Sequence, residues 1–84
     1  MTFEVELGPK AEKAIDKLPK ELALRITKKL HLLKENPFRF LEHIEKDKFY
    51  KLRIGDYRAL IEIDFERKIL VVRMLDKRSR IYKR

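Results

Sequence analysis

The sequence predicts an α+β domain of order β-α-α-β-β-β, with a helical hairpin packed on one face of a small, curved, mainly antiparallel sheet. Three observations predict it. The chain opens with an alternating apolar segment, two helical patterns separated by Pro19 follow, and three extended segments fill most of the second half. With 84 residues and a 44% hydrophobic fraction, residues 1–84 can form one domain with one modest core.

The opening segment TFEVEL alternates apolar and acidic side chains, which is the period of a half-buried strand. Gly8 and Pro9 end this strand and open a helix, because proline suits the first helical position. The apolar stripe of this helix consists of Ala11, Ala14, Ile15 and Leu18. Pro19 then ends the helix.

A second helix starts after Pro19, with Glu21 in its first turn, and ends before Asn36-Pro37. Its apolar residues recur at helical spacing and are Leu22, Ile26, Leu30 and Leu33. The two helices therefore form a hairpin. The next segment, FRFLEHIEKDK, is predicted to be a connection whose apolar residues tuck against the core.

Three extended segments follow, at residues 49–54, 57–66 and 68–75. The middle one alternates most clearly and places on one face Tyr57, Ala59, Ile61, Ile63 and Phe65. We expect an antiparallel meander, with a second turn at residues 66–68. The last nine residues, 76–84, are predicted to be a basic tail.

Charge is unevenly distributed along the chain, whose net charge is +8. Residues 1–45 carry nine Lys/Arg and eight Asp/Glu, whereas residues 46–84 carry thirteen and six. Clustered cations raise association rates with polyanions and release counterions on phosphate binding. The asymmetry indicates nucleic acid or an acidic protein as partner, although a basic surface that only confers solubility would give the same composition.

Several classes of function and location are disfavoured by composition. The chain has no cysteine, and His31 and His43 lie twelve residues apart, so we expect no metal and no other cofactor. No segment approaches the roughly 18 apolar residues of a membrane span, and no signal peptide is evident, which predicts a cytoplasmic protein. Glutamine is absent and Asn36 is the only asparagine, a pattern typical of thermophilic proteins.

The hairpin around Gly55-Asp56 gathers cations on one face. A two-residue loop places Arg53 opposite Arg58, with Lys51 on the same side, away from the helices. Like charges facing each other in a sheet cost up to ~1 kcal/mol. Either nearby carboxylates, Glu62 and Asp64, relieve this repulsion or an external anion does, and we favour the anion. The opposite face, toward the helices, takes Tyr50, Leu52, Ile54, Tyr57, Ala59 and Ile61.

Four motifs in this order together resemble the RelE/ParE superfamily of toxin-antitoxin toxins: KAIDKLPKELALRI, LLKENP, YKLRIGDYRALIEI and KRSRIY. The resemblance covers nearly the whole chain, and LRIGDYR is its most specific block. It implies the same fold, with an RNA-binding concavity on the face opposite the hairpin.

The resemblance also implies site residues. RelE-like members cut mRNA in the ribosomal A site, whereas ParE-like members poison DNA gyrase; Arg78 and Tyr82 match the C-terminal catalytic Arg and Tyr of the RelE branch. Arg58 matches the central catalytic Arg, and Lys51 the basic residue on the preceding strand. The residues expected to bind RNA are Arg53, Lys46, Lys48, Lys77 and Arg80. Three of these depart from the usual pattern, because Lys46 and Lys48 stand where some members have Arg, and Lys77 stands where many have His.

The chemistry implied is metal-independent cleavage of RNA. The 2′-OH of the RNA attacks the adjacent phosphate and leaves a 2′,3′-cyclic phosphate and a 5′-OH. Arg58 and Arg78 would stabilise charge on the phosphorane, because a guanidinium stays cationic and matches phosphate oxygens. Tyr82 would act as base if surrounding cations favour its phenolate, and Lys51 would supply that charge or act as base itself.

The implied partners are mRNA, the ribosome and an acidic RelB-like antitoxin, which forms a higher-order hetero-oligomer with the toxin. Two alternatives remain open. In a ParE-like gyrase inhibitor, Tyr82 would be an ordinary tail residue. In a nonenzymatic RNA-binding α+β module, the basic sheet face would be an electrostatic platform; double-stranded RNA-binding domains, however, end in a helix, and none is evident after Leu75.

Overall fold

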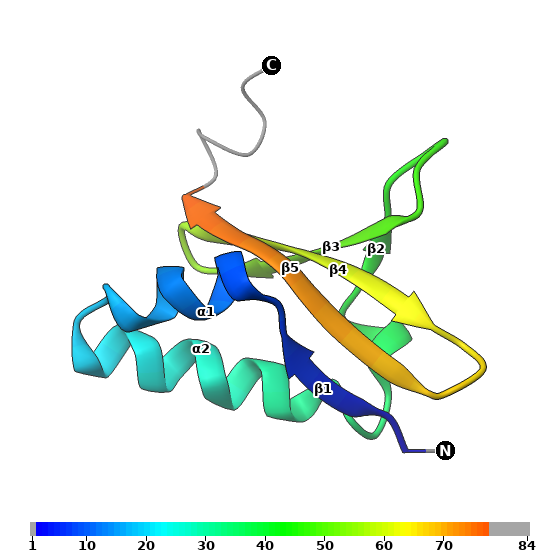
Figure 1. Cartoon of the computed structure of the whole chain (residues 1–84), viewed down its shortest axis with the longest axis horizontal. Coiled ribbons are helices and arrows are strands. Elements are labelled where there is room, and N and C mark those ends of the chain that lie inside the picture. Colours follow the sequence, from blue (N-terminus) through cyan, green and yellow to red (C-terminus); the bar gives the residue numbers. More distant parts are fainter. Residues whose placement is uncertain (1, 78–84) are drawn as a thin grey trace.

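A computed structural model describes residues 2–77, which form two layers (Figure 1). The elements in chain order are β1 (Glu4–Leu7), α1 (Pro9–Asp16), α2 (Lys20–Leu32), the 3-10 helix η1 (Pro37–Arg39), β2 (Glu42–His43), β3 (Phe49–Ile54), β4 (Tyr57–Asp64) and β5 (Ile69–Lys77). Both α-helices lie on one side of a five-stranded sheet of order β1-β5-β4-β3-β2. The predicted fold class is confirmed, and the sheet is mainly antiparallel because only β1 pairs in parallel, with β5.

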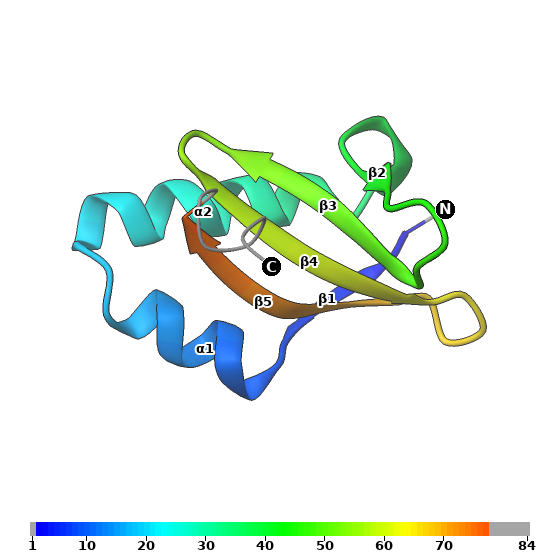
Figure 2. The ribbon, with the colours of Figure 1, turned by 90° about the horizontal axis from the view of Figure 1, so that it is seen from above.

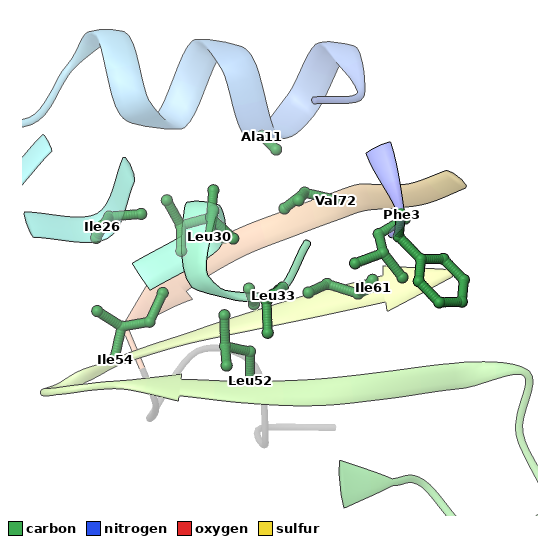
Figure 3. Packing of buried hydrophobic residues seen from close by; sticks show 12 residues of the cluster. Phe3, Ala11, Ile26, Leu30, Leu33, Leu52, Ile54, Ile61 and Val72 are labelled. Atoms are coloured by element: carbon green, nitrogen blue, oxygen red, sulfur yellow. The ribbon is translucent and has the colours of Figure 1, made fainter. Parts of the chain in front are cut away.

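The core lies between the helical hairpin and the sheet (Figure 3). Ile26 and Leu33 from the second helical segment are fully buried, as are Leu52, Ile61 and Val72 from the three central strands. Phe40 and Leu41, in the connection after α2, pack against this core as expected. Burial of these side chains fixes which face of each strand points toward the helices, and thereby exposes the other face.

The loop at Gly55-Asp56 sets the register of β3 and β4. The observed pairs are Ile54 with Tyr57 and Arg53 with Arg58, as a two-residue loop requires. Gly55 has a φ of 58°, a left-handed conformation that costs other residues roughly 1–2 kcal/mol. The register of β4 and β5 shifts between Leu60 and Ile61, which leaves Arg73 as an extra, bulged residue on β5.

Three element boundaries differ from the sequence prediction, and one strand is additional. The last strand continues through Asp76 and Lys77, which pair with Arg58 and Tyr57, so these two residues belong to the sheet and not to a tail. Phe65 was expected on the inward face but lies in the turn beyond β4 and is 57% exposed. The helix α2 ends at Leu32, before the expected boundary, and the two-residue strand β2 was not predicted. Among residues 2–77, no helix is long and apolar enough to cross a bilayer.

Candidate functional site

The candidate site lies on the sheet face opposite the helices, at the end formed by the β3–β4 turn (Figure 2). Arg53 and Arg58 are directly opposed across β3 and β4, and Lys51 is two residues earlier on the same side of β3. Their neighbours Leu52, Ile54 and Ala59 are buried in the core. Strand alternation therefore directs the three cations away from the helices, as the sequence predicts.

Arg58 is the one buried charged residue in the described part of the chain, and it is only 3% exposed. Its Nη1 donates to the carbonyl oxygens of Tyr57 and Gly55, at 3.1 and 3.3 Å. Its Nε is buried and has no hydrogen-bond partner among the described residues. The turn thus holds one end of the guanidinium, while the Nε lacks an acceptor. An unsatisfied buried donor of this kind costs about 1–3 kcal/mol. The hairpin pattern had not indicated that Arg58 is buried.

Arg53 is exposed, and no carboxylate within residues 2–77 lies within 4.0 Å of its guanidinium or of that of Arg58. The like charges of this pair are thus not neutralised by a described ion pair. A phosphate oxygen would supply both the missing acceptor and the missing negative charge.

Lys51 is partly neutralised by a residue that sequence reasoning missed. Its Nζ lies 3.4 Å from Glu42 Oε1, and its side chain is 19% exposed. Glu42 is on β2, which pairs with β3 opposite Lys51. No local pattern pointed to this contact, since it depends on the two-residue strand β2.

The less favoured alternative, relief of this repulsion by Glu62 and Asp64, does not hold in the structure. Glu62 accepts a hydrogen bond from Arg73 Nε at 3.0 Å and lies 3.8 Å from Lys48 Nζ. Asp64 accepts from the backbone N–H of Arg67 at 3.0 Å. Both carboxylates lie toward the opposite end of β4, because the register pairs Glu62 with Phe49 and not with Arg53.

The other residues expected to bind RNA are spread out. Lys48 lies next to the Glu62 pair, five residues before Arg53, and Lys46 is in the exposed turn before it, with a φ of 64°. Lys77 is exposed and pairs with Tyr57, so strand alternation places it on the other side of the sheet from Arg58. Arg78, Arg80 and Tyr82 lie outside the described residues. The structure thus brings together Lys51, Arg53 and Arg58.

A family of toxins matches residues 5–82, and its description is the ParE toxin of type II toxin-antitoxin system, parDE. The chain therefore belongs to this family, within the RelE/ParE superfamily that the sequence motifs indicated. No curated protein matches the chain.

Solved structures of RelE toxins share the fold. A toxin from the RelBE2 toxin-antitoxin complex of Mycobacterium tuberculosis is 25% identical with a TM-score of 0.82, covering 93% of this chain and all of that chain. The archaeal RelE-RelB complex from Pyrococcus horikoshii gives 26% identity and a TM-score of 0.80, covering 95% of this chain and 99% of that chain. A variant of Escherichia coli RelE in the free state is 26% identical with a TM-score of 0.69, covering 92% of this chain and 84% of that chain. The chain is thus similar over nearly its full length to toxins of RelE type.

Proposed function

We propose that the chain is a ribosome-dependent mRNA endoribonuclease of RelE type, acting in the cytoplasm. The observation that carries the proposal is the Arg53–Arg58 pair, whose buried member has an unsatisfied donor. A buried guanidinium held by its own turn is preorganised, and preorganised charge stabilises a phosphorane at no reorganisation cost during the reaction. The likeness to RelE structures supports the same assignment.

In this proposal Arg58 and Arg78 stabilise the negative charge that develops on the phosphate, and Arg53 holds a neighbouring phosphate oxygen. Tyr82 takes the proton from the 2′-OH, and Lys51 stabilises the phenolate or accepts that proton itself. The leaving 5′-oxygen takes up a proton, so the products are a 2′,3′-cyclic phosphate and a 5′-OH. No step requires a metal or a protein nucleophile.

The proposed partner in the uninhibited state is the ribosome with its mRNA, and in the inhibited state an acidic RelB-like antitoxin. The RelE structures that this chain resembles include complexes with RelB. An acidic partner complements the net charge of +8. We also propose a higher-order hetero-oligomer for the complex and, from the amide-poor composition, a thermophilic source.

Primer extension on mRNA held in programmed ribosomes tests the activity. We expect cleavage at the A-site codon that requires ribosomes and falls sharply in Arg58→Ala, Arg78→Ala and Tyr82→Phe. Intact mRNA after incubation of wild-type protein with ribosomes from a compatible source would contradict the proposal. Equal cleavage by the variants would contradict the assigned roles.

A second candidate function, inhibition of DNA gyrase, is favoured by the ParE description of the matching family. This reading assigns the cationic face to contact with a protein and gives Tyr82 no chemical role. Supercoiling of relaxed plasmid by gyrase, with and without the chain, distinguishes the two functions. Inhibition that persists in Tyr82→Phe, together with intact ribosome-bound mRNA, would establish the gyrase reading.

A further inference from the structure

A groove runs between α2 and the outer edge of β3, beside the candidate site. In the described sheet, β2 pairs only with Tyr50 and Lys51 of β3, so residues 52–54 have no strand on their outer side. The helix α2 passes behind the β3–β4 turn, whereas α1 lies beyond β5 (Figure 2). The uncovered face of the sheet is therefore continuous with the groove around residues 52–54.

The groove is rich in cations and encloses about 260 Å³. It is lined by Arg25, Lys28, Lys29, Leu32, Arg53, Ile54 and Gly55, among which there is no carboxylate. The α2 residues are spaced at i, i+3, i+4 and i+7, so they form one face of the helix. The groove is thus lined by cations from both α2 and β3, together with the apolar side chains of Leu32 and Ile54.

Most of these cations have no anionic partner in the part of the chain that is described. Arg25, Lys28 and Arg53 have no carboxylate within 4.0 Å among residues 2–77, and Lys29 Nζ lies 4.8 Å from the centre of the Phe40 ring. Unpaired cations converging on a groove repel one another, and a bound polyanion removes that repulsion.

The groove and the candidate site share two residues. Arg53 lines the groove and is opposite Arg58. Gly55 accepts a hydrogen bond from Arg58 Nη1 through its carbonyl oxygen, and a Cβ at Gly55 would lie 3.5 Å from Arg25 Nη2. The Arg25 guanidinium therefore lies beside the turn that holds Arg58, and a ligand on Arg53 can continue into the groove.

We propose that this groove binds the phosphate backbone of the single-stranded RNA that flanks the cleaved bond, an inference that rests on the proposed function. Arg25, Lys28 and Lys29 contact phosphates beyond the one held by Arg53 and Arg58. They contribute affinity and position the strand, and they do not take part in the chemistry. Because the contacts are to phosphates, they read no base sequence.

A second groove, between α1 and β5, provides a matched comparison. It is lined by Lys10 and Lys13 of α1 and by Lys17 directly after that helix, but also by Asp76, and it contains neither Arg53 nor Gly55. The same number of cations can therefore be removed from this second groove without changing the proposed RNA path.

The test measures binding of the full chain to fluorescein-labelled 2′-O-methyl oligoribonucleotides of three and nine nucleotides, which resist cleavage because the attacking 2′-OH is blocked. Wild type is compared with Arg25→Gln/Lys28→Gln/Lys29→Gln and with Lys10→Gln/Lys13→Gln/Lys17→Gln. Glutamine keeps helix propensity, and circular dichroism checks folding. We expect only the α2 variant to lose affinity for the nine-mer, on the order of tenfold, with a salt slope lower by about 2, since each single-strand phosphate contact releases about 0.7 counterion. Affinity for the three-mer stays unchanged.

Three results would overturn the groove proposal: equal losses of affinity in both triple variants, an unchanged affinity in the α2 variant, or equal binding of both oligonucleotides by wild type. An unchanged α2 variant would point instead to an acidic protein as occupant. Cleavage of ribosome-bound mRNA by wild type is measured in parallel. If wild type cleaves mRNA but binds the nine-mer no more tightly than the three-mer, the groove proposal is overturned and the endonuclease proposal stands. The opposite result is also informative. If wild type does not cleave mRNA but binds the nine-mer more tightly than the three-mer, and only the α2 variant loses this difference, the endonuclease proposal is overturned and the groove remains an RNA-binding surface.

Discussion

On the sheet face opposite the helices, the two ends differ in how their charged side chains are paired. At the end near Asp64, Glu62 binds Arg73 at 3.0 Å and lies 3.8 Å from Lys48, so opposite charges compensate one another. At the β3–β4 turn, Arg53 faces Arg58, and no carboxylate among residues 2–77 lies within 4.0 Å of either guanidinium. This difference shows that the number of cations alone does not identify a candidate phosphate-binding site. What marks the turn end is that neither guanidinium of the Arg53–Arg58 pair has a carboxylate within 4.0 Å among residues 2–77.

The strongest way to break this comparison is to exchange Arg58 for methionine. We expect Arg58→Met to reduce cleavage of ribosome-bound mRNA on the order of 10²–10³-fold, since it removes a preorganised donor. The free energy of unfolding should stay equal or rise by about 1 kcal/mol, because methionine removes a buried, unsatisfied charge. Primer extension and urea denaturation measure the two effects. Arg73→Met, at the compensated end, is the control and should leave cleavage nearly unchanged; equal losses of cleavage would contradict the distinction between the ends.

A weaker effect is expected at the exposed member of the pair. Arg53→Ala should weaken binding of an uncleavable nine-nucleotide RNA about tenfold, since a hydrogen bond to a charged group contributes about 1.5 kcal/mol. Arg53→Lys should retain part of that affinity, because lysine keeps the charge but not the bidentate fork. Fluorescence anisotropy measures both. Unchanged binding in Arg53→Ala would show that this cation does not contact RNA.

The turn itself is expected to contribute to stability. Gly55→Ala should lower the free energy of unfolding by about 1–2 kcal/mol, because Gly55 has a φ of 58° and alanine avoids that region. Gly55→Asn should cost less, since asparagine tolerates the left-handed conformation better. Denaturant titration compares the two variants. A larger loss of unfolding free energy in Gly55→Asn than in Gly55→Ala would contradict this explanation. It would mean that a clash with Arg25, and not the backbone conformation, determines which residues fit at this position.

The smallest effect is expected at the compensated end. Glu62→Gln should lower the free energy of unfolding by at most ~1 kcal/mol, because exposed ion pairs contribute little. Salt should diminish this difference between wild type and variant. Denaturation at low and high ionic strength measures it. A loss of RNA cleavage comparable to that of Arg58→Met would place this end within the functional site.

Much of the fold could be predicted because its signals are local. Alternation identified β3 and β4, helical spacing identified the buried stripe that includes Ile26 and Leu33, and the two-residue loop fixed the pairing of Arg53 with Arg58. The parallel pairing of β1 with β5 was not specified, since the two strands are separated by the rest of the fold.

Less of the candidate site could be predicted from the sequence. The face and register of Arg53 and Arg58 followed from alternation, but the burial of Arg58 and its unsatisfied Nε did not, because they depend on how the turn packs. The pairing of Lys51 with Glu42 required the unpredicted β2, and the position of Arg25 over Gly55 required the placement of α2. Tertiary contacts between distant segments leave no periodic trace in the sequence.

The most direct test of the central claim is a nuclear magnetic resonance titration of the full chain with an uncleavable 2′-O-methyl oligoribonucleotide. We expect chemical-shift changes at the backbone amides of Arg53, Gly55 and Arg58, and none of similar size at Glu62 and Arg73. Changes concentrated at Glu62 and Arg73, or no change on this face at all, would contradict the claim that the uncompensated end binds RNA phosphate.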